Sequence, residues 1–301
     1  MDPKIICWNV RGLNGLNRRD VVKKKIRDWN PNIVLLQETK IQQWNDLLVW
    51  KCWSKKSLKW LDSPSQASSG DILCLWDSSK IQVLDYLLGP YSITILCKNV
   101  SNGFEWMFTG LYAPCSSHTD EVYLFWRQIE QVRCFWNYPW VLGGEFNEIR
   151  FSHERSSGGD VTNGMDRFDR FISKHHLIDL PLHGDTYTWT NNQIQSIRSR
   201  IDRFLISPDW ECVYPQVIQQ ALARPCSDHN LLALICQGLK FGPPPFRCSA
   251  GYIFCKKLQL LKLKLREWSK REYVDVDRRL QDLEDVFVAL DEAENANNGL
   301  S

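Results

Sequence analysis

The sequence contains no long uninterrupted apolar run, and none of its stretches approaches the roughly 18 residues that a membrane-spanning helix needs. This absence excludes an integral membrane protein built from helices. No cleavable leader precedes the first apolar segment at residues 4–10, so we expect that the protein is not secreted. We therefore expect it inside the cell, in the nucleus or the cytoplasm, without a membrane partner.

The sequence also has almost no net charge, because 37 Lys and Arg residues against 35 Asp and Glu residues leave +2. Net charge therefore gives no sign of a nucleic-acid partner, and any basic binding surface has to be local. No two of the 11 cysteines stand at C-x-x-C spacing. The absence of this spacing argues against a zinc site with close ligand pairs. The odd number of cysteines argues against a disulfide framework. A reducing compartment fits both observations.

What the sequence does contain is the composition of an ordinary folded protein. Hydrophobic residues make up 44% and charged residues 24%, which excludes a wholly disordered chain. Apolar runs at 4–10 and 33–38 flank an amphipathic segment at 18–29. This pattern predicts a strand, a helix and a strand at the start of an α/β domain. Further helices are expected at 120–135 and 167–176.

From residue 70 onward, short runs rich in β-branched and aromatic residues alternate with turn residues. They predict an antiparallel meander of strands at 72–76, 81–84, 92–96 and 106–112. Later strands are expected at 140–144, 186–190, 201–206 and 231–236. Mixed strands with helices between them predict two sheets packed face to face, with the helices outside.

A proline-rich break at 242–245 marks the expected domain boundary. Residues 1–240 are predicted to form the globular domain, and residues 241–301 a linker and an amphipathic helical connector. The connector's charges are split between a basic first part and an acidic second part. A solvated helix or coiled-coil arm is favoured over a nucleic-acid arm. We expect any helix-mediated contact to run through 256–290.

Polar side chains collect at the ends of the predicted strands, where a sheet fixes the backbone and loops open to solvent. These residues are Asn9, Glu38, Tyr112, Glu145, Asn147, Asp202, Asp228 and His229. We expect them to converge in one cleft between the sheets. The alternative for Asp202 is an ion pair with Arg200 or Arg203, and the alternative for His229 is a structural role in the core.

Six short motifs stand in order along the chain. They are W-N-V-R-G-L (8–13), L-Q-E-T-K (36–40), G-L-Y-A-P (110–114), G-G-E-F-N (143–147), S-R-I-D-R (199–203) and S-D-H (227–229). Through them the chain resembles the endonuclease/exonuclease/phosphatase superfamily. Within it, the chain is similar to the endonuclease domain of plant LINE-type (non-LTR) retrotransposons. That similarity is strengthened by E-I-R (148–150), S-G-G (157–159), L-I-D-L (177–180) and Y-T-W-T-N (187–191).

The resemblance covers residues 1–240 and implies a four-layer α/β sandwich of two mixed β-sheets flanked by helices. It also implies a Mg²⁺- or Mn²⁺-dependent phosphodiesterase, a DNA endonuclease that nicks one strand. Residues 241–301 resemble the helical connector that precedes the reverse transcriptase in such elements. Because no polymerase follows, we expect a fragment or a decayed copy of a retrotransposon.

The resemblance also implies a role for each residue of the site. Glu38 and Asp228 would bind the metal, a hard cation that prefers carboxylate oxygens, and Asn9 would support the metal or the phosphate. His229 would contact the scissile phosphate or take a proton from water, two roles that the sequence leaves open. Asp202 would orient the imidazole ring of His229.

Three further residues complete the implied site. Asn147 would hold the nucleophilic water or a phosphoryl oxygen, Tyr112 would donate its phenolic hydrogen to the phosphate, and Glu145 would orient or deprotonate the attacking water. The family has Asp where this chain has Glu145. The extra methylene moves the carboxylate by about 1 Å, and such a displacement can cost about 10²-fold in rate.

Two alternative functions therefore remain open. One is a catalytically impaired relic that binds nucleic acid weakly at most, and the other is an apurinic-type repair nuclease or small-molecule phosphatase of the same superfamily. Five arginines flank the motif loops, where jointly they would follow a phosphate backbone and singly would be surface residues: Arg11, Arg150, Arg155, Arg198 and Arg200. Asp71 is expected to perturb only the start of a strand. Trp189 is expected in the core, with a place near the DNA cleft as the alternative.

Overall fold

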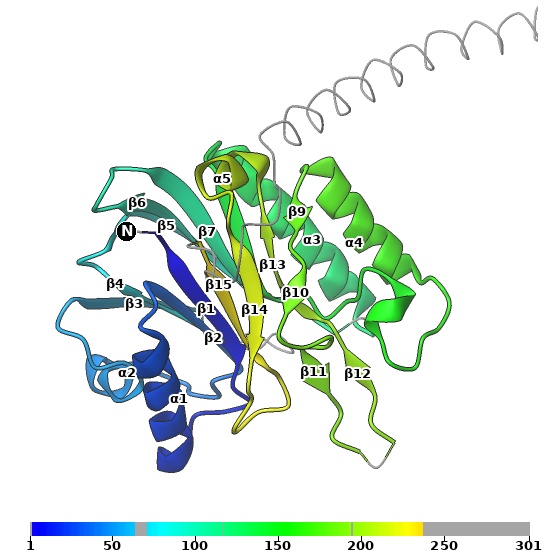
Figure 1. Cartoon of the computed structure of the whole chain (residues 1–301), viewed down its shortest axis with the longest axis horizontal. Coiled ribbons are helices and arrows are strands. Elements are labelled where there is room, and N and C mark those ends of the chain that lie inside the picture. The colour runs from blue at the N-terminus through cyan, green and yellow to red at the C-terminus, as the bar shows by residue number, and fades with distance from the viewer. Residues whose placement is uncertain (1, 64–70, 116, 194, 237–301) are drawn as a thin grey trace, which may run out of the picture. The chain divides into compact units, whose positions relative to one another are not determined.

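The computed structural model describes residues 2–63, 71–115, 117–193 and 195–236. These residues form two mixed β-sheets with helices on the outer face of each (Figure 1). The predicted connector at 241–301 lies outside the described residues and stays a prediction. No helix in the described ranges is long and apolar enough to cross a membrane.

The first sheet has, among the described residues, seven strands in the order β10-β14-β15-β1-β2-β4-β3. They are β1 (Lys4–Asn9), β2 (Ile33–Gln37), β3 (Leu58–Ser63), β4 (Ile72–Asp77), β10 (Leu182–His183), β14 (Ile218–Leu222) and β15 (Leu231–Ile235). Strand β1 is parallel to β2 and antiparallel to β15. Two helices pack on the outer face, α1 (Leu16–Trp29) and α2 (Asp46–Cys52).

The second sheet has, in the same part of the chain, six strands in the order β5-β6-β7-β8-β13-β9. They are β5 (Ile81–Gly89), β6 (Ser92–Asn99), β7 (Glu105–Tyr112), β8 (Trp140–Glu145), β9 (Ile178–Asp179) and β13 (Asp202–Ile206). Strand β7 is parallel to β8, and β8 is antiparallel to β13. Helices α3 (Thr119–Phe135) and α4 (Asn163–Lys174) contribute to the core on its outer face.

Short elements complete the described fold. They are the hairpin of β11 (Trp189–Thr190) and β12 (Arg198–Ser199), the 3₁₀ turn η1 (Ser152–Glu154) and helix α5 (Pro208–Val213).

The sheets pack together through side chains that alternate along each strand. On β1, Ile5 and Cys7 join the core between the sheets, whereas Ile6 and Trp8 join the core beneath α1 and α2. Successive side chains of a strand point to opposite faces, so one strand supplies both cores. Both faces are covered, which explains why β1 and β2 read as continuous apolar runs. The predicted α/β sandwich of four layers is confirmed.

The predicted meander is wrong in one strand. Strands β5, β6 and β7 do form an antiparallel meander, but β4 lies in the other sheet, between β2 and β3. The turn after Asp77 carries the chain from one sheet to the other. Both strands that flank this turn have ordinary strand patterns, so the local sequence does not reveal which sheet each one joins.

Other predicted elements differ in their bounds. The helix expected at 167–176 begins at Asn163, because the Thr162 hydroxyl accepts a hydrogen bond from the Met165 N–H and caps it. The strand expected at 186–190 is limited to β11. The prediction omitted seven short elements, each two to seven residues long: α2, α5, β3, β9, β10, β12 and β14.

Gly144 allows the two sheets to meet close to the strand ends. Its φ is +138°, and a Cβ there would lie 2.1 Å from the carbonyl oxygen of Leu111 on the neighbouring strand and 2.6 Å from Nε2 of Gln37 in the other sheet. The Gln37 side chain of β2 donates to that same oxygen of β7 over 2.7 Å. This bond between the sheets fixes the end of β2, and therefore the position of Glu38, relative to the second sheet.

Candidate active site

The strand registers bring polar residues together at one end of the sandwich. In the second sheet, Glu145 is paired with Tyr112 on one side and with Asp202 on the other. In the first sheet, the last pair between β1 and β2 is Asn9 with Gln37. Glu38 follows Gln37 directly, so it lies next to Asn9. Residues far apart in the sequence therefore meet because each ends or begins a strand at the same edge.

Three residues at this end have a left-handed backbone without being glycine. The φ angles are +50° at Arg11, +50° at Glu38 and +51° at Asn147. Such conformations cost of order 1–3 kcal/mol each and persist where the surroundings enforce them, often at functional sites. Here they turn the chain at strand ends and direct side chains to the edge of the sheets.

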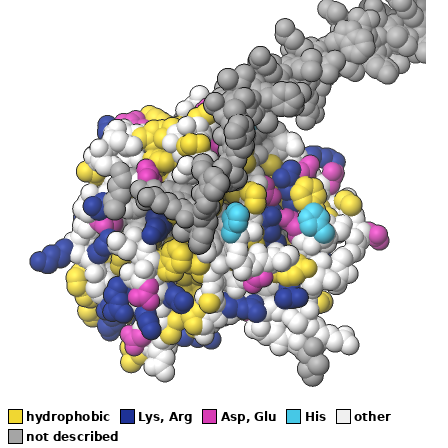
Figure 2. Space-filling model, in the orientation of Figure 1, with side chains coloured by type: hydrophobic (Ala, Val, Ile, Leu, Met, Phe, Trp, Pro, Cys, Tyr) yellow, Lys and Arg dark blue, Asp and Glu magenta, His cyan; other side chains and the backbone are white. Residues whose placement is uncertain are grey.

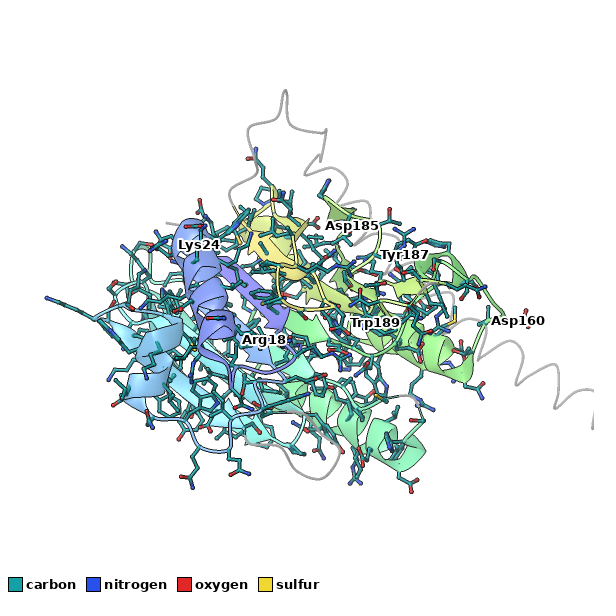
Figure 3. All side chains as sticks on the ribbon, turned by 90° about the horizontal axis from the view of Figure 1, so that it is seen from below. Arg18, Lys24, Asp160, Asp185, Tyr187 and Trp189 are labelled. Atoms are coloured by element: carbon teal, nitrogen blue, oxygen red, sulfur yellow. The ribbon has the colours of Figure 1, made fainter. Side chains whose placement is uncertain are left out.

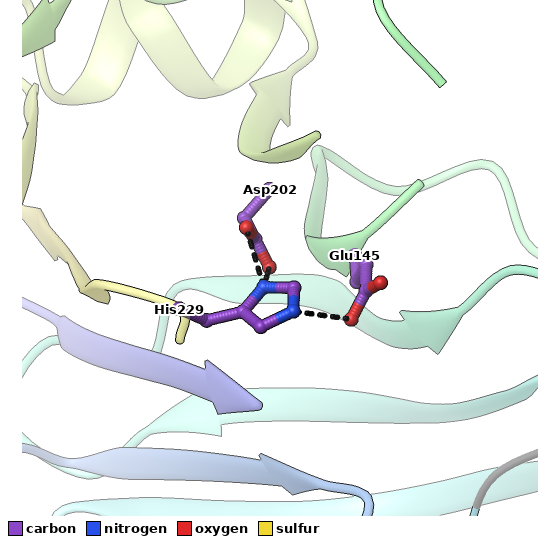
Figure 4. A group of neighbouring side chains, drawn as sticks. All are labelled: Glu145, Asp202 and His229. Atoms are coloured by element: carbon purple, nitrogen blue, oxygen red, sulfur yellow. Dashed lines mark hydrogen bonds and ion pairs between the residues drawn. The ribbon is translucent and has the colours of Figure 1, made fainter. Parts of the chain in front are cut away.

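A buried histidine and aspartate form the centre of the cluster (Figure 4). Both carboxylate oxygens of Asp202 lie 3.0–3.1 Å from Nδ1 of His229. The other ring nitrogen, Nε2, is buried without a hydrogen-bond partner among the described residues and lies 3.8 Å from Oε2 of Glu145. One nitrogen of His229 is thus held by a carboxylate while the other faces the remaining acids.

The protonation of this pair follows from its surroundings. Burial alone would lower the pKa of His229, but the charges of Asp202 and Glu145 raise it above its usual value. Burial raises the pKa of the Glu145 carboxyl, and the His229 charge partly opposes that rise. A protonated imidazole donates from both nitrogens, so Nε2 is a donor directed at the carboxylate cluster.

Asn9 and Tyr112 hold the carboxylates in place. The Asn9 amide donates to Oε1 of Glu38 over 2.9 Å and to Oε2 of Glu145 over 2.6 Å. Its own oxygen accepts from the Arg11 N–H over 3.0 Å. Tyr112 donates its hydroxyl to Oε1 of Glu38 over 2.8 Å. In this arrangement both side chains position carboxylates, and the Asn9 oxygen is already engaged by the backbone.

Asp228 lies at the more open side of the cluster, where its side chain is 20% exposed. It accepts from Nε of Arg11 over 2.9 Å and from the indole N–H of Trp189 over 3.1 Å. Burial alone would raise the pKa of Asp228, but the hydrogen bond and charge of Arg11 lower it. Arg11 also donates to both oxygens of Glu38 over 3.2 Å.

Sequence reasoning missed two of these partners. Arg11 was one of five flanking arginines, and Trp189 was expected in the core. The available signal for Arg11 was its place in W-N-V-R-G, two residues after Asn9. Trp189 is partly exposed and forms an isolated bridge with His229, which puts it at the rim of the cluster.

Asn147 lies beside the cluster rather than within it. Its side chain donates to the carbonyl oxygen of Ala113 over 2.6 Å, and this carbonyl follows Tyr112 in the chain. The bond ties the loop after β8 to the end of β7. Six of the residues expected to converge are joined by the contacts above, and Tyr112 joins them through Glu38: Asn9, Glu38, Glu145, Asp202, Asp228 and His229. That they line a cleft, and the role of each, stay predictions.

The expectation for Asp71 is wrong. Its carboxylate accepts from the Thr39 hydroxyl and, over 3.0 Å, from the Lys40 N–H, and its carbonyl accepts from the Glu38 N–H over 3.0 Å. Asp71 therefore fixes the turn that carries Glu38. The sequence placed it at a strand start but gave no sign of its partners 31 and 32 residues away.

The donor set fits a hard divalent cation. Four carboxylates, those of Glu38, Glu145, Asp202 and Asp228, are grouped around two cationic side chains, Arg11 and His229. The acids outnumber the bases, and an excess of negative charge away from bulk water favours a bound cation.

Two sets of these groups could hold such an ion. Glu145, Asp202 and His229 place ligand atoms within 4.8 Å of one another. Two of these three are already engaged with each other, because both oxygens of Asp202 lie 3.0–3.1 Å from Nδ1 of His229. Glu38 and Asp228 are the second set and the more open one, with 9% and 20% of their side chains exposed.

The arginines proposed as alternative partners of Asp202 bind elsewhere. Arg203, which is fully buried, donates to Glu154 over 2.7 Å and to Asp179 over 2.8 Å, and Arg200 donates to the same two acids. Asp202 is left to His229. These two arginines and two acids form a structural ion network next to the site.

The sequence of the chain matches the Endonuclease/Exonuclease/phosphatase family over residues 6–229. The chain belongs to this family. Members of the family are hydrolases that act on phosphodiesters or phosphate esters, and they generally use divalent metal ions. The matched segment contains every site residue described above. None of the curated proteins matches the chain.

Solved structures of the family share the fold. The 3′ phosphatase NExo from Neisseria, bound to a product DNA hairpin, has a TM-score of 0.62 at 18% identity, over 78% of this chain and 99% of that one. The AP endonuclease LMAP from Leishmania major has a TM-score of 0.61 at 15% identity, over 77% and 86%.

A third structure is the endonuclease domain of TRAS1, a telomere-specific non-LTR retrotransposon. It has a TM-score of 0.57 at 14% identity, over 77% of this chain and 97% of that one. At such identities these likenesses show the fold alone.

Proposed function

We propose that this protein is a metal-dependent phosphodiesterase that nicks one strand of DNA and derives from a non-LTR retrotransposon. The observation that carries the proposal is the Asp202–His229 pair, whose free Nε2 faces a cluster of carboxylates. Hydrolysis of a phosphodiester needs a cation on the phosphoryl oxygens, an oriented water and a proton donor or acceptor. The cluster contains side chains suited to each need.

Each residue has a task in this scheme. His229 donates from Nε2 to a phosphoryl oxygen, and Asp202 holds the ring in the tautomer and orientation that this requires. Glu145, whose Oε2 lies 3.8 Å from Nε2 of His229, orients the attacking water. Asn9 and Tyr112 keep Glu38 in position. Glu38 and Asp228 would hold Mg²⁺ or Mn²⁺, which would neutralise charge on the phosphoryl oxygens.

Basic side chains near the site support DNA as the partner. Helix α1, whose Arg18 contacts the loop that carries Arg11, has six basic side chains along its length: Arg18, Arg19, Lys23, Lys24, Lys25 and Arg27. Lysine and arginine side chains gather over this region in the space-filling view (Figure 2). Arg18 lies at one end of α1 and donates to the carbonyl of Arg11, and Trp189 contacts Asp228 (Figure 3). A basic surface at the rim of the cluster suits a phosphate backbone.

The test is nicking of supercoiled plasmid in Mg²⁺ by wild-type protein and His229→Ala. The proposal expects open-circular product from the wild type, none with a chelator, and at least about a 10³-fold lower rate for His229→Ala. His183→Ala, a change of an exposed histidine on β10, is the matched control and should nick like the wild type. Nicking that survives His229→Ala would contradict the assignment of the site.

A catalytically impaired relic is the second candidate, and Glu145 favours it. Its Oε2 accepts from the Asn9 amide over 2.6 Å and lies 3.8 Å from Nε2 of His229. The Glu145 side chain, one methylene longer than Asp, therefore occupies the space between these two groups. Glu145→Asp separates the candidates. An impaired enzyme would gain activity by up to about 10²-fold in this variant, whereas a competent one would lose activity.

Other substrates of the family are distinguished in the same assay. An apurinic-site nuclease would cut a duplex with an abasic site far faster than intact plasmid, and a small-molecule phosphatase would release phosphate without nicking either DNA. A preference for intact DNA supports the retrotransposon line.

A further inference from the structure

Arg11 bridges the two carboxylates to which the proposed function assigns the metal. Its Nε donates to Asp228 over 2.9 Å, and its Nη1 donates to both oxygens of Glu38 over 3.2 Å. The side chain of Arg11 is 39% exposed, whereas those of Glu38 and Asp228 are 9% and 20% exposed. A single guanidinium therefore pairs with both acids from the more open side of the cluster and offsets one of their two negative charges.

The backbone around Arg11 is fixed without help from its guanidinium. The Arg11 N–H donates to Asn9, and its carbonyl accepts from Arg18 over 2.6 Å. The N–H of Gly12 donates to the carbonyl of Glu38, also over 2.6 Å. The side chain can therefore swing away from the acids while the loop stays in place.

The two carboxylates are also held independently of Arg11. Glu38 accepts from Tyr112 and Asn9, and Asp228 accepts from Trp189. If the guanidinium leaves, each acid keeps at least one neutral donor that fixes its direction. The pair then stays oriented but carries uncompensated negative charge, which is the condition that favours a divalent cation.

We propose that Arg11 is an internal cation that competes with the divalent metal for Glu38 and Asp228. The inference rests on the proposed function, because it takes these two acids as the metal ligands. A guanidinium and a dication repel each other, so their positive charges compete for the same two carboxylates. Binding of the metal therefore requires Arg11 to leave, and the protein binds metal more weakly than its acids alone would.

The test measures Mn²⁺ binding by the full chain without DNA, from the electron paramagnetic resonance signal of the free ion. Arg11→Gln removes the competing charge and should tighten Mn²⁺ binding about tenfold, which corresponds to about 1.4 kcal/mol. Arg11→Lys keeps the positive charge but lacks the planar guanidinium that reaches both acids. Its Mn²⁺ affinity should lie between those of the wild type and Arg11→Gln. The control Arg170→Gln changes an arginine of α4 whose side chain is 78% exposed, and it should leave the affinity unchanged.

Thermal unfolding separates competition from a fixed structural bridge. Without metal, Arg11→Gln should unfold at a lower temperature than the wild type, because Glu38 and Asp228 then repel each other. At saturating Mn²⁺, the two proteins should unfold at the same temperature. If Arg11 has only a structural role, the difference in unfolding temperature should persist at every metal concentration. Removal of Arg11 should then weaken Mn²⁺ binding.

The outcomes also separate this inference from the function on which it rests. Equal or weaker Mn²⁺ binding by Arg11→Gln, together with lost binding by Glu38→Gln, overturns the competition and leaves the proposed function standing. Absence of Mn²⁺ binding by folded wild-type protein overturns both. If Arg11→Gln does not fold, an unchanged affinity in Arg11→Lys overturns the competition.

Discussion

At the scale of single residues, the strand-end acids and amides were readable from the sequence because each stands in a short motif. Their partners were not readable. Asp228 is bound by Arg11 and Trp189, which lie 217 and 39 residues away, and no local pattern encodes such pairs. Asn9 illustrates the same limit, because only the folded chain shows that its amide links Glu38 to Glu145.

Asp202→Asn tests the role of the aspartate behind His229. The amide can accept at only one oxygen and cannot stabilise a positive ring, so we expect nicking to fall by about 10³–10⁴-fold. The rate of plasmid nicking measures this directly. Asp209→Asn, at an exposed position at the start of α5, should nick normally. A loss of less than tenfold in Asp202→Asn would show that the imidazole does not depend on this carboxylate.

Asp77, the last residue of β4, lies outside the site and contributes a pH-dependent part of the free energy of unfolding. Burial alone would raise its pKa, but hydrogen bonds from Lys55, Ser57 and Ser79 lower it to about 2. Because the folded pKa is below the unfolded value, this stabilisation is present above about pH 4 and is lost as the pH falls toward 2. The loss should amount to roughly 2 kcal/mol in urea unfolding curves, and Asp77→Asn should not show it. Parallel pH curves for the two proteins would contradict this.

At the scale of elements, the sequence predicted strands whose two faces are both covered, and it missed short strands and sheet membership. Strands β1 and β2 were recognisable because their apolar runs are continuous. Strand β14 was missed because two polar residues, Gln219 and Gln220, interrupt its apolar pattern. Gln219 is nevertheless fully buried. Gln219 donates to the carbonyl of Leu180 and accepts from the N–H of Phe204, contacts that only the tertiary fold supplies.

The ion network of Arg203 joins β13, β9 and η1 next to the site. Glu154→Gln would leave the buried guanidinium of Arg203 short of charge, which should cost about 3–5 kcal/mol. For a domain of this size, that is a fall in Tm on the order of 10 °C, measured by circular dichroism. Asp166→Asn breaks an exposed pair with Arg170 and should cost less than about 0.5 kcal/mol. Similar shifts in the two variants would contradict a stabilising network.

At the scale of the whole molecule, the first and last described strands of the domain lie side by side. Strand β1 pairs with β15, and the Cys236 N–H donates to the carbonyl of Pro3. The sequence predicted both strands but could not show that they pair, because 225 to 231 residues separate the partners.

This closure predicts where the chain can be shortened. A protein ending at residue 240 retains every described strand and should unfold cooperatively. A protein ending at residue 226 lacks β15 and the S-D-H motif and should not fold, because β1 and β14 lose a central partner. Circular dichroism during heating measures both. Failure of the longer protein to fold would show that residues 241–301 are needed for the domain.

The most direct test of the central claim is one time course of plasmid nicking, in which Mg²⁺ is first present, then removed by a chelator and then restored. If Glu38 and Asp228 gather a divalent ion beside His229, nicking should proceed, stop and resume with the ion, in the wild type or at least in Glu145→Asp. Plasmid that stays supercoiled throughout with both folded proteins would contradict the claim, as would nicking that continues after the chelator is added.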